Sequence, residues 1–224
     1  MTHPAPERRA RAERGDYTAN HARLLDAAFA VFDETDVDAP LSMVAARAGV
    51  GEATLYRHFT NRDELVLELY EIAVVEIERA VLAALDAPHP DAAARLDAFF
   101  EAMVGAIARH RSYPLIAIRG TRLRPGRPSD PRVAVAGRAL VAESIEAGLL
   151  APDVLITDLT TLALAVGTLA ADANPATDFG WRRHLALGRR GLAPGDADRH
   201  TATLAAVEVP AWLLATRGGP VSSG

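Results

Sequence analysis

A stretch at residues 49–59, GVGEATLYRHF, places a phenol, a guanidinium and an imidazole at three consecutive positions, Tyr56, Arg57 and His58. Each of these groups can donate a hydrogen bond, and Thr54 adds a hydroxyl close by. Donors of these kinds contact phosphate oxygens and base edges when proteins bind DNA. The residue types therefore indicate contact with a nucleic-acid backbone, with a solvated helix surface as the alternative.

Other kinds of chemistry find little support in the sequence. The chain has no cysteine, which excludes disulfides, thiolate metal ligands and a cysteine nucleophile. The histidines show no close metal-ligand spacing; they are His3, His21, His58, His89, His110, His184 and His200. Because no catalytic constellation emerges, we expect no enzyme activity, no metal and no cofactor.

The overall charge argues mildly against binding to nucleic acid. The formal net charge is -5, and the chain contains no lysine. Residues 1–64 hold eight arginines against eleven acidic residues. DNA binding would therefore depend on a local surface, and its basic phosphate contacts must come from arginine or histidine.

The apolar residues predict a helical protein that does not enter a membrane. Half of the residues are hydrophobic but only 5% are aromatic, so alanine, leucine and valine must fill the core. Alanine also has the highest helix propensity, which favours an all-α fold. No apolar run reaches the roughly 18 residues of a membrane span, and no secretory leader is recognisable, so we expect a cytoplasmic protein.

Two short helices around a tight turn would position the donors. We expect the first over 42–48, capped by Ser42, and the second over 52–59. Ala45 allows a close crossing, Gly49 tolerates the positive φ of the turn, and Leu55 faces back. This spacing is typical of a helix-turn-helix, whose second helix can enter a major groove. An unrelated helical corner is the alternative.

Apolar spacing predicts helices along most of the remaining chain. They cover about 18–33, 62–85, 91–110, a short stretch after Pro114, 132–148, 153–173, 179–192 and 201–216, the last interrupted by Pro210. A capping box is expected at Asn61 and Glu64. The proline- and arginine-rich segment 121–131 should form an exposed, mobile loop. We divide the chain into a basic mobile tail (1–17), a domain that contains the helix-turn-helix (18–64) and a larger helical domain (65–224).

The amino-acid sequence of residues 24–69 indicates a particular protein family more specifically than the spacing of the apolar residues does. The segments LLDAAFAVFDE and SMVAARAGVGEATLYRHFTNRDELVLEL strongly resemble the DNA-binding domain of TetR-type transcriptional regulators. A later segment, WRRHLALGRRGL at 181–192, looks like the C-terminal helix of an actinobacterial-type branch of that family. The resemblance implies a homodimeric, ligand-responsive repressor that binds a palindromic operator and is released by a small molecule.

The resemblance also implies residue roles. Tyr56 would pack on sugar-phosphate, His58 and Thr54 would donate to phosphate, and Arg62 would hold a phosphate where the family usually has lysine. The full predicted DNA-contacting set is Ser42, Glu52, Ala53, Thr54, Tyr56, Arg57, His58 and Arg62. Two departures weaken the match: Gly51 lacks the usual capping hydroxyl, and Glu52 would repel phosphate or accept from a cytosine amino group. They leave open an alternative, a helical small-molecule binding protein with a weakened DNA-binding head.

Two further expectations concern the larger domain. An effector pocket could be lined by Phe99, Phe100, Met103, Ile107, Tyr113, Ile116, Arg119 and Trp181, although such residues often form plain core. A homodimer interface is expected over about 153–192, because 153–173 is too apolar to bury against one small domain. Its small residues, Ala163, Ala165, Gly167 and Ala170, would let a partner helix approach.

Overall fold

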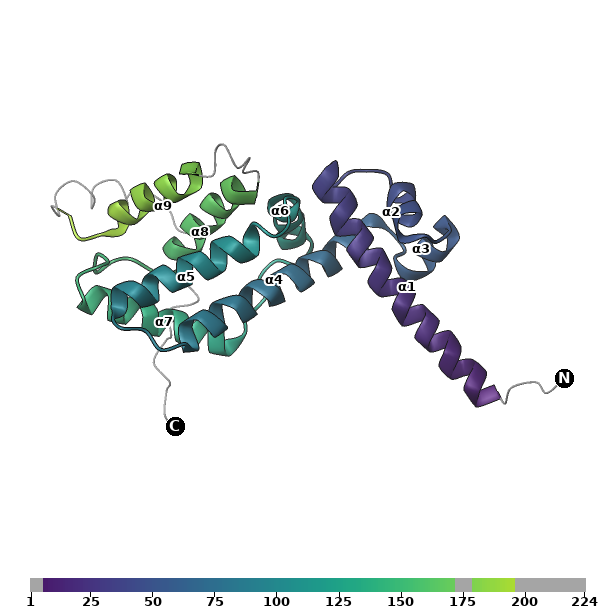
Figure 1. Ribbon diagram of the computed structural model, residues 1–224, viewed down its shortest axis with the longest axis horizontal. Helices are drawn as coiled ribbons and strands as arrows, with labels where there is room; N and C mark the ends of the chain where they lie inside the picture. The colour runs from purple at the N-terminus through teal and green to yellow at the C-terminus, as the bar shows by residue number, and fades with distance from the viewer. Residues whose placement is uncertain (1–5, 172–178, 196–224) are drawn as a thin grey trace. The chain divides into compact units, whose positions relative to one another are not determined.

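The computed structural model describes residues 6–171 and 179–195, with side chains from residue 16 onward. Within these ranges every regular element is an α-helix, which confirms the all-α prediction (Figure 1). The helices are α1 (Pro6–Glu34), α2 (Leu41–Ala48), α3 (Glu52–His58), α4 (Arg62–Asp86), α5 (Ala92–Ile107), α6 (Tyr113–Leu123), α7 (Pro131–Glu146), α8 (Ile156–Ala171) and α9 (Phe179–Leu192). The helix expected over 201–216 lies outside the described residues.

The helices form two compact units. Unit 1 contains α1 to α3, the part of α4 up to Val75, and α6 with its flanking residues 110–125. Unit 2 contains the rest of α4 from Glu76, together with α5, α7, α8 and α9. Each unit encloses its own group of buried apolar side chains.

Helix α1 begins at Pro6, well before the expected start at Thr18. Proline suits the first turn of a helix, and the alanines and arginines that follow have high helix propensity. Sequence pattern missed this extension because residues 6–17 lack an apolar stripe. The mobility expected of that segment stays a prediction. Farther along, α1 buries Leu24, Ala28 and Phe32 in unit 1, as the periodicity predicted.

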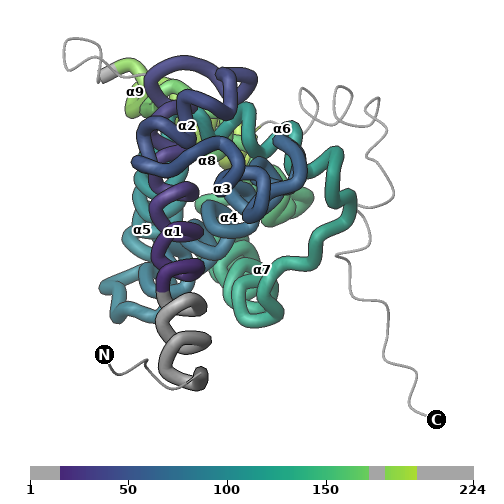
Figure 2. The backbone as a smooth tube through the Cα atoms, turned by 90° about the vertical axis from the view of Figure 1, so that its right-hand side faces the viewer, coloured from purple at the N-terminus to yellow at the C-terminus, as the bar shows by residue number. Residues whose placement is uncertain are grey.

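The turn between α2 and α3 has the expected geometry. Gly49 adopts a φ of 68°, in the left-handed region that favours glycine. Its N–H donates to the Ala46 carbonyl at 3.1 Å, and the Val50 N–H donates to the Ala45 carbonyl at 3.0 Å. This pair of bonds closes α2 as a Schellman motif. Figure 2 follows the backbone through the turn.

Ser42 does not cap α2, contrary to expectation. The helix begins one residue earlier, at Leu41, and its N-cap residue is Pro40. Ser42 therefore lies in the first turn with an exposed side chain. The Asn61 cap of α4 is confirmed by a 3.0 Å bond from the Glu64 N–H to Asn61 Oδ1. The reciprocal bond of the box is shifted, because Glu64 accepts from the Thr60 N–H instead.

In unit 2, small residues on α8 are used for packing within the chain. A Cβ on Gly167 would lie 2.6 Å from Cγ2 of Ile107, so α8 and α5 cross where only glycine fits. Ala163 is fully buried. The prediction that Ala163 and Gly167 admit a partner helix is therefore wrong. Gly167 admits α5 of the same unit instead, and Ala163 is buried within the chain.

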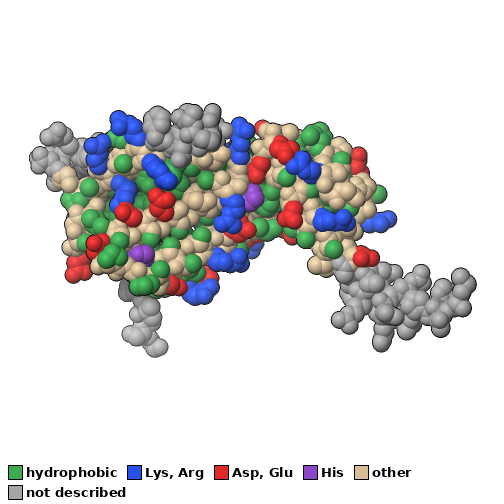
Figure 3. Space-filling view, viewed as in Figure 1, with side chains coloured by type: hydrophobic (Ala, Val, Ile, Leu, Met, Phe, Trp, Pro, Cys, Tyr) green, Lys and Arg blue, Asp and Glu red, His purple; other side chains and the backbone are tan. Residues whose placement is uncertain are grey.

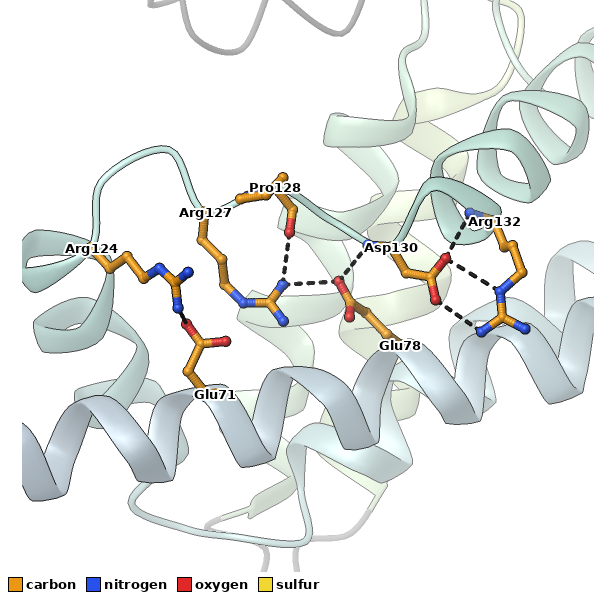
Figure 4. Close-up of polar contacts among 7 residues, drawn as sticks. All are labelled: Glu71, Glu78, Arg124, Arg127, Pro128, Asp130 and Arg132. Atoms are coloured by element: carbon orange, nitrogen blue, oxygen red, sulfur yellow. Dashed lines mark hydrogen bonds and ion pairs between the residues drawn. The ribbon is translucent and has the colours of Figure 1, made fainter.

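The segment between α6 and α7 is anchored by ion pairs rather than free. Arg127 pairs with Glu78 at 3.1 Å, and their side chains are only 12% and 14% exposed. Glu78 also accepts from the Asp130 N–H at 3.2 Å, and Asp130 caps α7 through the Arg132 N–H (Figure 4). In unit 1, Arg124 pairs with Glu71. These contacts argue against the mobile loop expected at 121–131.

The described helices include none that is both long enough and apolar enough to cross a membrane. Acidic and basic side chains are interspersed on the face shown in Figure 3, in keeping with the mixed charge of the sequence. A local surface must therefore carry any attraction to a phosphate backbone.

Candidate nucleic-acid interface

Helix α3 has one buried face and one open face. Leu55 is fully buried and packs with the small core of the corner, where Val44, Ala45, Ala48 and Phe59 are also buried. Val50, expected in this core, is only half-buried. The rest of α3 points away from that core, and Tyr56 keeps 52% of its surface exposed. The short helix thus presents its polar side chains rather than its apolar ones.

The predicted DNA-contacting residues differ in solvent exposure. Ser42, Glu52, Ala53, Tyr56 and Arg57 are exposed, whereas Thr54, His58 and Arg62 are half-buried. Five of the eight lie on the open side of α3 with no hydrogen bond from their side chains to other described residues: Glu52, Ala53, Thr54, Tyr56 and Arg57. These five are available to an external partner.

The N-terminus of α3 carries no side-chain cap. Gly51 occupies the N-cap position with an extended backbone, and no side-chain hydrogen bond closes the first turn. Glu52 lies in that turn, where an acidic side chain complements the helix dipole. Gly51 and Glu52, the two residues that depart from the family pattern, therefore both lie at the N-terminus of α3, the end of a helix that attracts anions.

Arg62 is held inside unit 1 by two backbone carbonyls. Its Nη1 donates to the Val37 carbonyl at 2.7 Å, and its Nη2 donates to the Ala39 carbonyl at 2.6 Å. The guanidinium therefore holds the connection between α1 and α2 against the start of α4. A guanidinium has five N–H groups, so these two bonds leave donors over, and the predicted phosphate contact of Arg62 stays a prediction.

His58 belongs to a polar cluster that the sequence did not reveal. Its Nδ1 lies 3.3 Å from Nδ1 of His21, and Nε2 of His21 lies 2.7 Å from Oε1 of Glu68. The Tyr17 ring covers the His58 ring with a centroid separation of 4.0 Å. Burial lowers the pKa of His58, the nearby His21 lowers it further, and Glu68 partly opposes both. The cluster joins α1, α3 and α4.

The predicted pocket residues are divided between the two units, and the pocket itself stays a prediction. Phe99, Phe100, Met103, Ile107 and Trp181 belong to unit 2, whereas Tyr113, Ile116 and Arg119 lie on α6 in unit 1. Apart from Met103 and Arg119, all are buried. A hollow of about 260 Å³ between α1 and α2 is lined by none of them; its lining is Arg23, Asp26, Ala27, Ala30, Arg47 and Ala48.

Arg119 needs a separate correction. Its guanidinium pairs with Asp63 at 2.6 Å and with Asp38 at 2.9 Å, within unit 1. Those carboxylates raise the pKa of Arg119, with Asp63 the larger cause. The side chain therefore ties α6 to the beginning of α4 and to the loop after α1. It does not line an apolar pocket.

A second contact attaches α6 to α1. The carboxylate of Asp33 accepts from the N–H and the hydroxyl of Ser112, at 2.8 and 2.6 Å, and lies 3.3 Å from Nδ1 of His110. Burial alone would raise the pKa of Asp33, but the bonds from His110 and Ser112 outweigh it and leave the pKa lowered. Sequence pattern could not have paired these residues, because 79 positions separate Asp33 from Ser112.

Comparisons with known proteins agree with this geometry. Residues 24–69 match the family model of bacterial regulatory proteins of the tetR family. None of the curated proteins matches the chain. Among solved structures, the chain resembles a bacterial regulatory protein of the tetR family from Rhodococcus RHA1, with 19% identity, a TM-score of 0.56 and coverage of 79% of this chain and 98% of that one.

Two further structures show the same fold. One is the ketosteroid transcriptional regulator KstR2 of Mycobacterium tuberculosis, at 19% identity and a TM-score of 0.55, covering 78% of this chain and 95% of that one. The other is a TetR family transcription regulator from Marinobacter aquaeolei VT8, at 15% identity and a TM-score of 0.55, covering 81% of this chain and all of that one. Residues 24–69 therefore carry a helix-turn-helix of the tetR family of bacterial regulatory proteins, and the solved structures share the all-helical fold of the chain.

Proposed function

We propose that the chain is a ligand-responsive repressor that binds a palindromic operator as a homodimer through α3. The observation that supports this most directly is the open face of α3. Leu55 is fully buried, whereas the neighbouring Tyr56 and Arg57 are exposed at the surface. A helix of this form, crossing α2 closely at a glycine turn, can enter a major groove without disturbing its own core.

The proposed contacts can be tested by titrating a labelled duplex that carries the inverted repeat nearest the gene. Tyr56→Ala should weaken binding by about 1–3 kcal/mol, because its ring and hydroxyl leave the interface. Unfolding should be unaffected, since the side chain is exposed. Tyr56→Phe is the matched variant: it keeps the ring and should lose only part of the affinity.

The homodimer is proposed to form through α8 and α9. Leu164 and Leu169 on α8 and Leu187 on α9 remain between 38% and 49% exposed in the single chain. Exposed leucines on neighbouring helices suit an isologous four-helix contact. We expect Leu164→Arg to dissociate the dimer in sedimentation experiments and to weaken operator binding. Val135→Arg, at an exposed valine on α7, is the matched control and should leave the dimer intact.

Release by a small molecule is the least direct part of the proposal. Its support is that, within unit 1, Asp33, Asp38 and Asp63 connect α6 and its N-cap Ser112 to α1, the loop after α1 and the start of α4. Movement of α6 would therefore disturb the helices that hold α3. A thermal-shift screen should find a compound that both stabilises the protein and lowers its operator affinity. A compound that stabilises without any effect on DNA would contradict this part.

The second candidate function is a small-molecule binding protein whose DNA-binding head is weakened. It is favoured by the uncapped N-terminus of α3, where Gly51 offers no hydroxyl and Glu52 brings a negative charge. If the wild type shows no preference for the inverted repeat over a random duplex of equal length, with or without ligand, this candidate replaces the repressor.

A further inference from the structure

The histidine cluster around α3 contains more than a packing contact. His58 is half-buried, its Nδ1 is directed at Nδ1 of His21, and no described residue is bonded to its Nε2. Within the part of the chain whose side chains are described, no group of three or more His, Cys, Asp or Glu residues could hold a metal ion. His21 contacts both His58 and Glu68, and each of these two hydrogen bonds needs one shared proton.

The tautomer of His21 follows from its partner. A carboxylate oxygen only accepts, so the 2.7 Å contact between Nε2 of His21 and Oε1 of Glu68 requires a proton on that nitrogen. A neutral imidazole carries one proton, which leaves Nδ1 of His21 as an acceptor. Glu68 thereby determines which histidine donates in the hydrogen bond between Nδ1 of His21 and Nδ1 of His58.

The tautomer of His58 follows from that of His21. With an acceptor at Nδ1 of His21, the 3.3 Å contact requires Nδ1 of His58 to donate. If His58 is neutral, its Nε2 then bears a lone pair and no proton. Phosphate oxygens also only accept, so a neutral pair arranged in this way offers the proposed DNA contact no donor.

One added proton gives Nε2 of His58 a hydrogen that it can donate to a phosphate. The positive charge can reside on His58, or on His21 if the shared proton moves from Nδ1 of His58 to Nδ1 of His21. In either arrangement Nε2 of His58 carries a proton and the pair carries a positive charge, balanced in part by Glu68. The groups directed at His58 from other elements are Tyr17 and His21 on α1, Phe59 after α3 and Glu68 on α4.

We propose that His21 and Glu68 are positioning residues that make the His58–phosphate contact depend on the uptake of one proton by the histidine pair in each protomer. This inference rests on the proposed function, because it assumes that His58 meets a phosphate. It predicts that DNA binding tightens as the pH falls. The lowered pKa of His58 is in keeping with a pair that is neutral before DNA arrives.

The first test measures binding against pH. Fluorescence anisotropy is recorded between about pH 6 and about pH 8.5 at constant ionic strength, with the inverted-repeat duplex and a random duplex. Uptake of one proton should strengthen wild-type binding by up to about tenfold per pH unit for each protomer. The control His89→Phe changes a histidine in unit 2 that bonds to the Ala84 carbonyl, and it should keep the wild-type slope.

The decisive variant is His21→Phe. It keeps a ring beside Phe59, whose centroid lies 5.0 Å from that of His21, but removes the acceptor that fixes His58. His58 can then hold its proton on Nε2 while neutral. We expect a flatter pH dependence and tighter binding than wild type at high pH. A purely structural role for His21 would weaken binding at every pH instead.

A second measurement needs neither DNA nor a variant. Nitrogen-15 NMR of the free wild type near pH 8 should show His21 protonated on Nε2 and His58 protonated on Nδ1. A neutral His58 protonated on Nε2 would overturn the proposal, as would wild-type binding with no pH dependence or a His21→Phe slope equal to that of wild type. Failure to bind either duplex at any pH would instead overturn the proposed function, and the NMR result would still decide the proton arrangement.

Discussion

The α2–α3 corner and the α8–α9 pair both bring two helices close together at a glycine, yet they leave opposite surfaces exposed. In the corner, Leu55 is fully buried and Tyr56 and Arg57 are exposed. In the α8–α9 pair, leucines remain exposed on the outer side. Exposed hydrogen-bond donors are suited to contact with a phosphate backbone, whereas exposed leucines are suited to packing against a second copy of the chain.

The two glycines also serve different purposes. Gly49 has a positive φ, and a Cβ placed there would meet nothing within 4 Å. Gly188 is helical, and a Cβ there would lie 2.4 Å from Cδ1 of Leu162. The first glycine is required by backbone conformation and the second by the lack of space, so a close crossing of helices does not by itself indicate a DNA-binding corner.

The largest expected effect is at the core of the corner. Leu55→Ala should lower the free energy of unfolding by about 2–5 kcal/mol, because a fully buried side chain leaves a cavity. Leu187→Ala, at an exposed leucine of α9, should change the stability of the monomer far less. Denaturant unfolding checks this when both changes are made in the Leu164→Arg background, which we expect to be monomeric. Equal losses would break the contrast between the two regions.

Arginines of the two units should also differ in their effect on stability. Arg62→Gln should cost about 1–3 kcal/mol, because it frees two carbonyls that the guanidinium satisfies. Arg109→Gln in unit 2 removes only an exposed pair with Glu76 and should cost at most about 1 kcal/mol. The comparison is made by thermal unfolding. A larger loss at Arg109 would show that ion pairs matter more in unit 2 than their exposure suggests.

The two glycines should respond in opposite order to the same substitutions. At Gly49, Ala should cost about 1–2 kcal/mol because of the left-handed backbone, and Asn should cost less. At Gly188, Ala should cost less than Asn, because the strain from overpacking, about 1–3 kcal/mol, grows with side-chain size. Denaturant unfolding of the four variants, with Ala and Asn at each of the two glycines, gives the two orders of stability. The same order at both sites would contradict the distinction.

The smallest effect is expected at Glu52. Glu52→Gln should destabilise the protein by a few tenths of a kcal/mol, because the side chain lies in the first turn of α3 and complements its dipole. The same change should tighten binding to every duplex, since a negative charge leaves the surface. If instead only one base pair of each half-site loses its preference, Glu52 reads a cytosine. Titration against a set of single-base variants separates the two.

Local signals were enough to predict much of the corner. The bounds of α3 lie within one residue of expectation, and Gly49, Ala45 and Leu55 have the predicted conformation or burial. The α9 bounds of 179–192 were also predicted. Such features depend on residues within one or two helical turns, whose spacing is visible in the sequence. The start of α1 at Pro6 was missed because residues 6–17 lack an apolar stripe. The cap of α2 was missed because Ser42 is the more common N-cap residue type, whereas the helix begins after Pro40.

By itself, the sequence determined that this protein is helical, where the chain turns between α2 and α3, and that Tyr56 and Arg57 lie outside the core of that corner. Only the tertiary structure decided how those side chains are held. His58 meets His21 and Glu68, Arg62 meets the Val37 and Ala39 carbonyls, and Gly167 meets Ile107. The physical reason is that helix propensity and backbone conformation act between near neighbours, whereas hydrogen-bond partners and close packing depend on which distant segments the fold brings together.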